Sequence, residues 1–451
     1  MIRSILSENR RTFALALPIM AGHVGQMLMG LIDTVMVGRV GMVPLAACAF
    51  ANTLLSIPFV FGFGVLSAVS VRASHAHGSG EYGEARGVVR GGVLLALGMS
   101  VPMALFLHAA LPWIGVLGQP EEINRAVGGF LLLCGWSAVP VFLTTVSKNF
   151  CEAFGRPWIP FWIVLGGVGL NAGLNWILIF GNWGFPAMGL EGAGIATLTA
   201  RILTAVAVFS YPYFARDLRA GWPLEGILCE SLKPAKILAR IGLPSGTQHF
   251  FEVSGFAIGS IMMGWISVAG LAAHQIAITC AATTFMIPLG LSQAVCVRVG
   301  QARGAGRLES IRPIILGGVG LAVAVMGCFV VVFVLGGRTI AACFVRDATV
   351  IALTAHLLFL AGIFQIFDGI QVVSAGALRG FEDTRVPMVI GVVSYWFVAL
   401  PVSYLTAFFM RMGAAGVWIG FVVGLGVAAA ALFGRVVKRC GGVSPIPAAT
   451  T

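Results

Sequence analysis

The sequence predicts an all-α integral membrane protein with twelve transmembrane helices in two pseudo-symmetric six-helix bundles. Three observations predict this fold: the composition, the number of apolar segments and an internal repeat. Of the 451 residues, 58% are hydrophobic and only 10% are charged, with a mean hydropathy of +0.96. Soluble proteins carry about 25% charged residues. The sixty glycines suit helices that pack closely in lipid.

About twelve apolar segments, most of roughly membrane-spanning length, follow one another along the chain. Their approximate limits are 13–38, 46–71, 88–110, 127–147, 158–181, 192–214, 241–265, 269–297, 313–335, 349–378, 387–409 and 414–434. The longest polar connection separates the sixth segment from the seventh. We therefore predict an N-terminal six-helix lobe over residues 1–215, a cytoplasmic linker over 216–240 and a C-terminal six-helix lobe over 241–451.

The basic residues test this count, because cytoplasmic loops of membrane proteins carry an excess of Lys and Arg. Of the 28 Lys and Arg residues, 22 fall at the two ends of the chain and in every second connection, and 5 fall in the opposite connections. The remaining one, Arg201, lies inside the sixth segment. This asymmetry predicts that both termini are cytoplasmic. The net charge of +11 does not indicate nucleic-acid binding, because the basic residues lie between apolar segments and form no single patch.

The two halves of the chain repeat at a constant offset of 226 residues, without a gap over about 75 residues. Matched pairs are Pro18 with Pro244, Met36 with Met262, Gly64 with Gly290, Arg72 with Arg298 and Gly80 with Gly306. Six helices between copies give both copies the same orientation, so we expect an axis along the membrane normal and a substrate path at the repeat interface. Gln26 aligns with Glu252 and Asp33 with Gly259, which predicts different tasks for the two lobes.

Three of the seventeen acidic residues, Asp33, Glu252 and Asp368, lie well inside apolar segments. A carboxylate at that depth costs about 2.5–3.5 kcal/mol on insertion scales and normally faces a bundle interior or a water-filled cavity. Arg201 is the only basic candidate partner at this depth, so a buried ion pair or a hydrogen-bonded core acid is the less favoured interpretation. We expect these carboxylates to bind a proton or a metal cation and to attract a cationic substrate.

Exchange of a bound proton or metal cation for a cationic substrate at these carboxylates needs no covalent chemistry. A carboxylate in a low-dielectric cavity holds a proton readily, and losing its negative charge weakens its hold on a cationic substrate and can shift a conformational balance. We therefore predict no catalytic residues and no enzymatic activity. The run Gly78–Gly83 matches GxGxxG, but no strand precedes it, and a Walker P-loop is absent from the sequence. Direct driving by ATP is not expected.

Polar and aromatic neighbours of the carboxylates are supporting candidates. Asn171 and Asn175, one turn apart, can offer oxygens to a cation near Asp33, although hydrogen bonding between helices is the alternative. Phe364 lies one turn before Asp368; its ring can face a cation but has no oxygen, so Na⁺ would need other donors. The remaining candidates for cavity positions are Gln26, Thr197, Gln275 and Gln365.

At these residues the chain resembles the multidrug and toxic compound extrusion (MATE) family, and within it the NorM-like branch. The matching runs are Gly30–Gly38, Leu170–Gly181, Phe250–Val253, Ala272–Gln275 and Ala375–Gly380. The resemblance implies that the two six-helix bundles surround a central cleft. It also implies export of cationic lipophilic compounds in exchange for Na⁺ or H⁺ across a bacterial inner membrane. It implies that Glu252 and Asp368 form a C-lobe cation site, with both as ligands if Na⁺ is the ion. It also implies that Asp33, Asn171, Asn175 and Thr197 form an N-lobe polar site.

The partners expected on this basis are the lipid bilayer and small cationic substrates, with the coupling ion in place of a cofactor. Two lobes make a monomer sufficient. A lipid-linked precursor flippase of a related superfamily is the alternative, but it would be expected to carry cationic cavity residues for a pyrophosphate headgroup. An intramembrane aspartyl protease is disfavoured, because glutamate is a poor substitute in such a pair and no GxGD run precedes Asp368. The choice between Na⁺ and H⁺ stays open.

Overall fold

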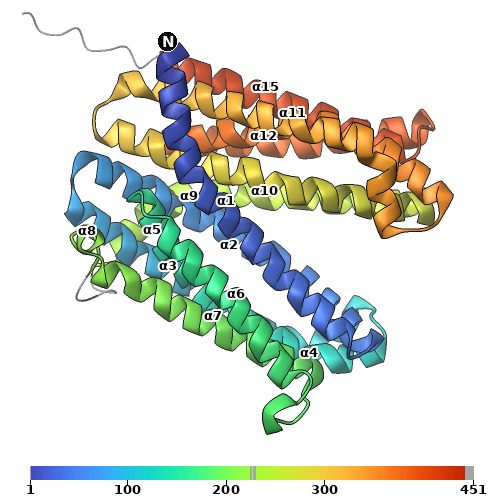
Figure 1. Ribbon diagram of the computed structural model, residues 1–451. Helices are drawn as coiled ribbons and strands as arrows, with labels where there is room; N and C mark the ends of the chain where they lie inside the picture. Colours follow the sequence, from blue (N-terminus) through green and yellow to red (C-terminus); the bar gives the residue numbers. More distant parts are fainter. Residues whose placement is uncertain (1, 224–225, 227–229, 442–451) are drawn as a thin grey trace, which may run out of the picture. The chain divides into compact units, whose positions relative to one another are not determined.

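The computed structural model describes residues 2–223, 226 and 230–441, and every regular element in this part of the chain is a helix (Figure 1). The α-helices are α1 Ile2–Gly38, α2 Met42–Ser79, α3 Tyr82–Ala110, α4 Glu121–Trp136, α5 Ala138–Ala153, α6 Trp158–Leu178, α7 Gly189–Phe214, α8 Arg216–Arg219, α9 Leu232–Ile266, α10 Val268–Gly304, α11 Ile311–Phe344, α12 Ala348–Gly380, α13 Arg385–Val392, α14 Leu400–Tyr404 and α15 Ala414–Gly441. Short 3₁₀ turns (η1 Leu111–Leu117, η2 Asn182–Gly184, η3 Leu308–Ser310) and π-helical turns (η4 Val393–Ala399, η5 Leu405–Phe409) complete the order. The predicted all-helical class is confirmed.

Eleven spans among the described residues are long and apolar enough to cross a membrane. α9 is not one of them, although its 35 residues extend over about 52 Å. Its middle carries Gln248, His249 and Glu252, and these polar side chains lower its hydropathy. With α9 the count reaches the predicted twelve.

Two predicted segments are interrupted in the structure. The segment predicted over 127–147 is α4 followed by α5, with Ser137 between them. Pro140 has no N–H for the carbonyl of Trp136, which loosens the helix at that turn. The segment predicted over 387–409 contains the π-helical turns η4 and η5, and Pro401 likewise leaves the carbonyl of Phe397 without its helical donor.

The chain divides into two compact units, one made of Ala21–Gly246 and the other of Met1–Met20 with Thr247–Thr451. Helices α1 and α9 therefore each contribute to both units. Each passes from one unit to the other two residues after an internal proline, Pro18 in α1 and Pro244 in α9. The predicted boundaries at residues 215 and 241 stay a prediction, and residues 224–225 and 227–229 of the predicted linker lie outside the described residues.

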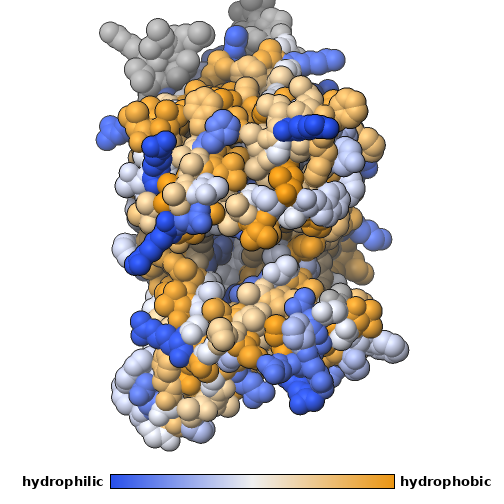
Figure 2. Space-filling view, turned by 90° about the vertical axis from the view of Figure 1, so that its right-hand side faces the viewer, coloured by the Kyte–Doolittle hydropathy of each residue, from blue (hydrophilic) through white to orange (hydrophobic). Residues whose placement is uncertain are grey.

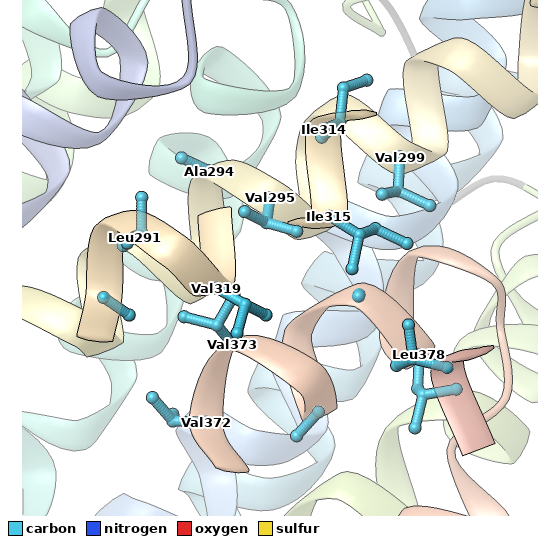
Figure 3. Close-up of a cluster of buried hydrophobic side chains, with 14 of the residues drawn as sticks. Leu291, Ala294, Val295, Val299, Ile314, Ile315, Val319, Val372, Val373 and Leu378 are labelled. Carbon is cyan, nitrogen blue, oxygen red and sulfur yellow. The ribbon is translucent and has the colours of Figure 1, made fainter. Parts of the chain in front are cut away.

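The unit that contains Thr247–Thr451 has a core built by α10, α11 and α12 (Figure 3). Its buried aliphatic side chains include Leu291, Val295, Ile315, Val319, Val373 and Leu378. Close approach of α10 and α12 depends on Gly376, where an added Cβ would lie 2.3 Å from Ser292 Oγ. Small residues at such contacts are the usual means of packing helices in lipid.

The unit Ala21–Gly246 has its own core between α2, α3 and α5, in which Val69, Val89 and Val146 are fully buried. Large apolar side chains remain on the surface of the protein, among them Phe106 at 70% exposure and Phe397 at 71%. Figure 2 shows hydrophobic residues over much of the visible face. Apolar surface of this extent suits lipid contact and would be costly in water.

The glycine-rich run Gly78–Gly83 contains the end of α2, a two-residue turn and the first two residues of α3. Gly80 has a φ of 76°, and its repeat partner Gly306 after α10 has a φ of 68°. These left-handed conformations favour glycine, which explains why both copies keep one here. The run is a helix stop in this structure.

Candidate functional site

Asp33 lies at the centre of a buried polar cluster in the unit Ala21–Gly246. Its Oδ1 accepts a hydrogen bond from Asn175 Nδ2 at 2.6 Å, and its Oδ2 accepts one from the Thr197 hydroxyl at 3.1 Å. Asn171 Nδ2 donates to Thr197 Oγ1, and Asn175 Nδ2 also lies 3.3 Å from Asn171 Oδ1. Helices α1, α6 and α7 thus bring together four residues that are far apart in the sequence.

Arg201 lies one turn after Thr197 on α7 and interacts electrostatically with Asp33. Its Nη1 donates to the Ser137 hydroxyl, and its guanidinium carbon lies 5.7 Å from the centroid of the Phe59 ring. A positive charge within a membrane span is therefore compensated by a carboxylate, a hydroxyl and an aromatic ring. The predicted cavity residue Gln26 is exposed and does not join the Asp33 cluster.

Glu252 and Asp368 form the second cluster, in the unit that contains Thr247–Thr451. Asp368 on α12 is 6% exposed, and it is close enough to Glu252 on α9 for the two charges to repel each other when both are ionised. The Tyr395 hydroxyl in η4 donates to Glu252 Oε1 at 3.0 Å, and Trp396 Nε1 donates to the carbonyl of Phe251. Two consecutive side chains of a π-helical turn therefore contact α9, and such turns are frequent at functional sites.

The predicted neighbours of Asp368 take different places. Gln365 is 2% exposed, and its Nε2 donates to the Thr284 hydroxyl at 2.6 Å. Phe364 packs its ring against Phe256 and Trp418, and Phe256 in turn packs against Tyr395, so Phe364 belongs to the same aromatic cluster as Tyr395. Gln275, in contrast, is exposed.

Three participants in this second cluster escaped the sequence reasoning: Tyr395, His249 and Arg379. The assignment of Arg379 to a cytoplasmic connection and of Arg201 as the only basic candidate at membrane depth stays a prediction, but Arg379 is a buried member of helix α12. Arg379 lies inside α12, is 5% exposed and donates from Nη2 to Ser292 Oγ at 3.0 Å. Its spacing of eleven residues from Asp368, about three helical turns, places both on one helix face. That spacing is visible in the sequence and indicates that Arg379 faces the same side of the helix as Asp368.

Unused oxygen atoms near the carboxylates could serve a cation. Asn175 Oδ1 in the first cluster has no hydrogen-bond partner, and neither have Gln365 Oε1 and Gln371 Oε1 on either side of Asp368. Hard cations take oxygen ligands from carboxylates, amides and water. Among the described residues, no group of three or more His, Cys, Asp or Glu side chains is arranged to hold a metal. The unused donors named above are all oxygen atoms, and such donors suit a proton or an alkali cation better than a soft transition metal.

The fold and these clusters define a multi-pass membrane transporter with buried ionisable groups. The sequence profile of the MatE family matches the chain twice, over residues 18–177 and 244–405. The chain belongs to the MatE family. The two matches begin 226 residues apart, as the internal repeat predicts.

Curated relatives and solved structures agree with this assignment. The chain is 37% identical to the "Probable multidrug resistance protein NorM" of Mesorhizobium japonicum over 96% of this chain and 94% of that protein. It is 33% identical to the protein of the same name from Geobacillus kaustophilus, over 93% and 92%. Its fold is similar to that of the eukaryotic MATE transporter AtDTX14, with a TM-score of 0.87 at 20% identity over 97% and 98% of the chains. The predicted NorM-like membership is confirmed.

Proposed function

We propose that the protein is a secondary antiporter that exports cationic lipophilic compounds in exchange for Na⁺ or H⁺. The observation that carries the proposal is that Glu252 and Asp368 interact electrostatically inside one apolar helical unit, where the Tyr395 hydroxyl donates to Glu252. Two carboxylates in one apolar site repel each other when both are ionised, so binding of a proton or a cation between them is favourable. Binding of a proton or a Na⁺ ion is therefore the natural role of this pair.

The Asp33 cluster is the proposed place for the positive charge of the substrate. Asp33 has two oxygens that each accept one hydrogen bond from the protein, so lone pairs remain for a ligand. Arg201 interacts with the same carboxylate, so a cationic substrate would share or replace that interaction. The two clusters lie in different units, which supports a division between substrate binding and ion coupling.

The relatives named NorM are called multidrug resistance proteins, and this supports small lipophilic drugs as the substrate class. A bacterial inner membrane with both chain ends in the cytoplasm is the proposed location, on the distribution of Lys and Arg. A single chain holds both clusters, so a monomer is the proposed working unit. No cofactor besides the coupling ion is proposed.

The test is export of ethidium from proteoliposomes that contain the purified protein. A Na⁺ gradient and a pH gradient are imposed separately, and empty liposomes are the control. Export driven by either gradient is the expected result and identifies the coupling ion. Lack of export under both gradients, across several cationic dyes, would contradict the antiporter and favour the lipid-linked flippase.

A further inference from the structure

A chain of polar contacts connects α10 with Glu252 through two residues that have no role so far. Arg379 Nη2 donates to Ser292 Oγ at 3.0 Å, and Arg379 Nη1 lies 3.3 Å from His249 Nε2. His249 Nδ1 in turn lies 3.6 Å from Glu252 Oε2. The order of contacts is therefore Ser292, Arg379, His249 and Glu252, all within one compact unit.

The first contact determines which nitrogen of His249 carries the proton. A guanidinium group only donates hydrogen bonds, so His249 Nε2 must accept from Arg379 and cannot carry a proton itself. A doubly protonated ring would direct an N–H at the guanidinium and place two positive charges side by side. This contact therefore favours the ring form that carries its proton on Nδ1, because the partner of one ring nitrogen sets the state of the other.

The second contact brings His249 Nδ1 close to the carboxylate of Glu252. The groups that face Glu252 are His249 on its own helix α9, Tyr395 from η4, and Asp368 and Arg379 from α12. Tyr395 donates to Oε1, and His249 Nδ1 lies 3.6 Å from Oε2, a close polar contact that is slightly longer than a hydrogen bond. Each carboxylate oxygen thus has one polar group beside it and keeps lone pairs for a cation.

We propose that Arg379 and His249 are positioning residues for the coupling cation. Arg379 holds His249 in the Nδ1–H form, and His249 holds Glu252 in the orientation that binds the cation. The free carboxylate would otherwise sample several rotamers, and fixing it beforehand improves ion affinity by removing that ordering cost. This inference rests on the proposed function, in which Glu252 binds the coupling ion.

Two substitutions of His249 separate the two contacts. The amide nitrogen of His249→Asn takes the place of Nδ1 and can still donate to Glu252. The longer side chain of His249→Gln reaches the place of Nε2, so it can accept from Arg379 but loses the donor to Glu252. We expect His249→Gln to raise the half-saturating concentration of the coupling ion about tenfold with the maximal rate retained, and His249→Asn to stay close to the wild type.

Substitutions of Arg379 test the first link. Arg379→Gln should raise the half-saturating ion concentration, since an amide can also accept and no longer imposes one ring form. Arg379→Lys should keep the half-saturating ion concentration close to that of the wild type, because an ammonium group only donates hydrogen bonds. His356→Gln is the matched control, because His356 lies on α12 and is exposed. An unchanged ion dependence in both His249→Gln and Arg379→Gln, with normal membrane insertion, would overturn the proposal.

The form of the His249 ring can also be measured by spectroscopy on the wild-type protein, so this test does not depend on whether a variant folds. Nitrogen-15 NMR of protein labelled at histidine, in lipid nanodiscs, reports which ring nitrogen is protonated, and the signal of His249 is the one absent in His249→Asn. We expect a protonated Nδ1 and a bare Nε2 in the wild type, and a mixture of both forms in Arg379→Gln. A protonated Nε2 in the wild type would overturn the proposal. Failure of the antiporter itself would show separately, as ethidium export that follows neither ion gradient.

Discussion

Replacement of Asp33 by Asn tests the electrostatic role of the first cluster with little change in shape. In the structure, Asp33 Oδ1 accepts from Asn175 and Oδ2 accepts from the Thr197 hydroxyl. An asparagine can keep the first bond with its carbonyl oxygen and donate the second from its amide, because the hydroxyl of Thr197 has two lone pairs. The variant therefore removes the charge and preserves the hydrogen-bonded framework.

The expected effect is a loss of affinity for a cationic substrate. A hydrogen bond or contact to a charged group is worth about 1.5–3 kcal/mol, and about 1.4 kcal/mol corresponds to a factor of ten in affinity. We therefore expect ethidium binding to weaken roughly 10- to 100-fold. The loss also leaves Arg201 without its carboxylate, so the double variant with Arg201→Gln should regain thermal stability without regaining ethidium affinity.

Ethidium binding to purified protein can be followed by fluorescence anisotropy, with Asp347→Asn as the matched control. Asp347 is exposed at the N-terminus of α12, where an asparagine can still accept from the Thr349 and Val350 amides. Ion binding at the other unit can be followed by tryptophan fluorescence, since Trp418 packs on Phe364 near Asp368. Wild-type ethidium affinity would refute the substrate role of Asp33, and loss of all ion binding would refute the division between the units.

The other predictions concern the unit that contains Thr247–Thr451. Glu252→Gln and Asp368→Asn should each abolish ion-coupled dye export while insertion and folding are retained, and normal efflux in both variants would contradict the cation site. Gly376→Val should destabilise the protein by about 1–3 kcal/mol or more, because its side chain would collide with Ser292 on α10. The measurement is thermal unfolding in detergent, and the control is Gly327→Val, where an added Cβ has open space; equal melting temperatures would refute the packing argument.

Hydropathy and charge were sufficient to predict the helical membrane fold. The apolar segments were predictable because a helix in lipid satisfies its own backbone hydrogen bonds, so local composition decides where spans occur. The repeat was predictable because its prolines and glycines have local roles, as the positive φ of Gly80 and Gly306 shows. Interruptions such as the π-helical turn η4 were not predicted, since they depend on which neighbouring helix receives the side chains.

The candidate site was predictable in part and for a specific reason. A carboxylate inside an apolar run is conspicuous, so Asp33, Glu252 and Asp368 could be found one by one. The side chains that complete each cluster are ordinary residues at large separations, such as Tyr395, which lies 143 residues after Glu252. Nothing local distinguishes that tyrosine from one that faces lipid.

Arg379 shows most clearly where local pattern and tertiary structure divide. Its charge and its position near the end of an apolar segment predicted a place in a cytoplasmic connection. In the structure α12 continues past it to Gly380, and the close contact of α10 at Gly376 brings Ser292 to its guanidinium. Local composition thus determines where a chain enters the membrane and which charges are costly there. Only the packing of helices from distant parts of the chain decides which partners compensate those charges, because a hydrogen bond depends on distances in space and not along the sequence.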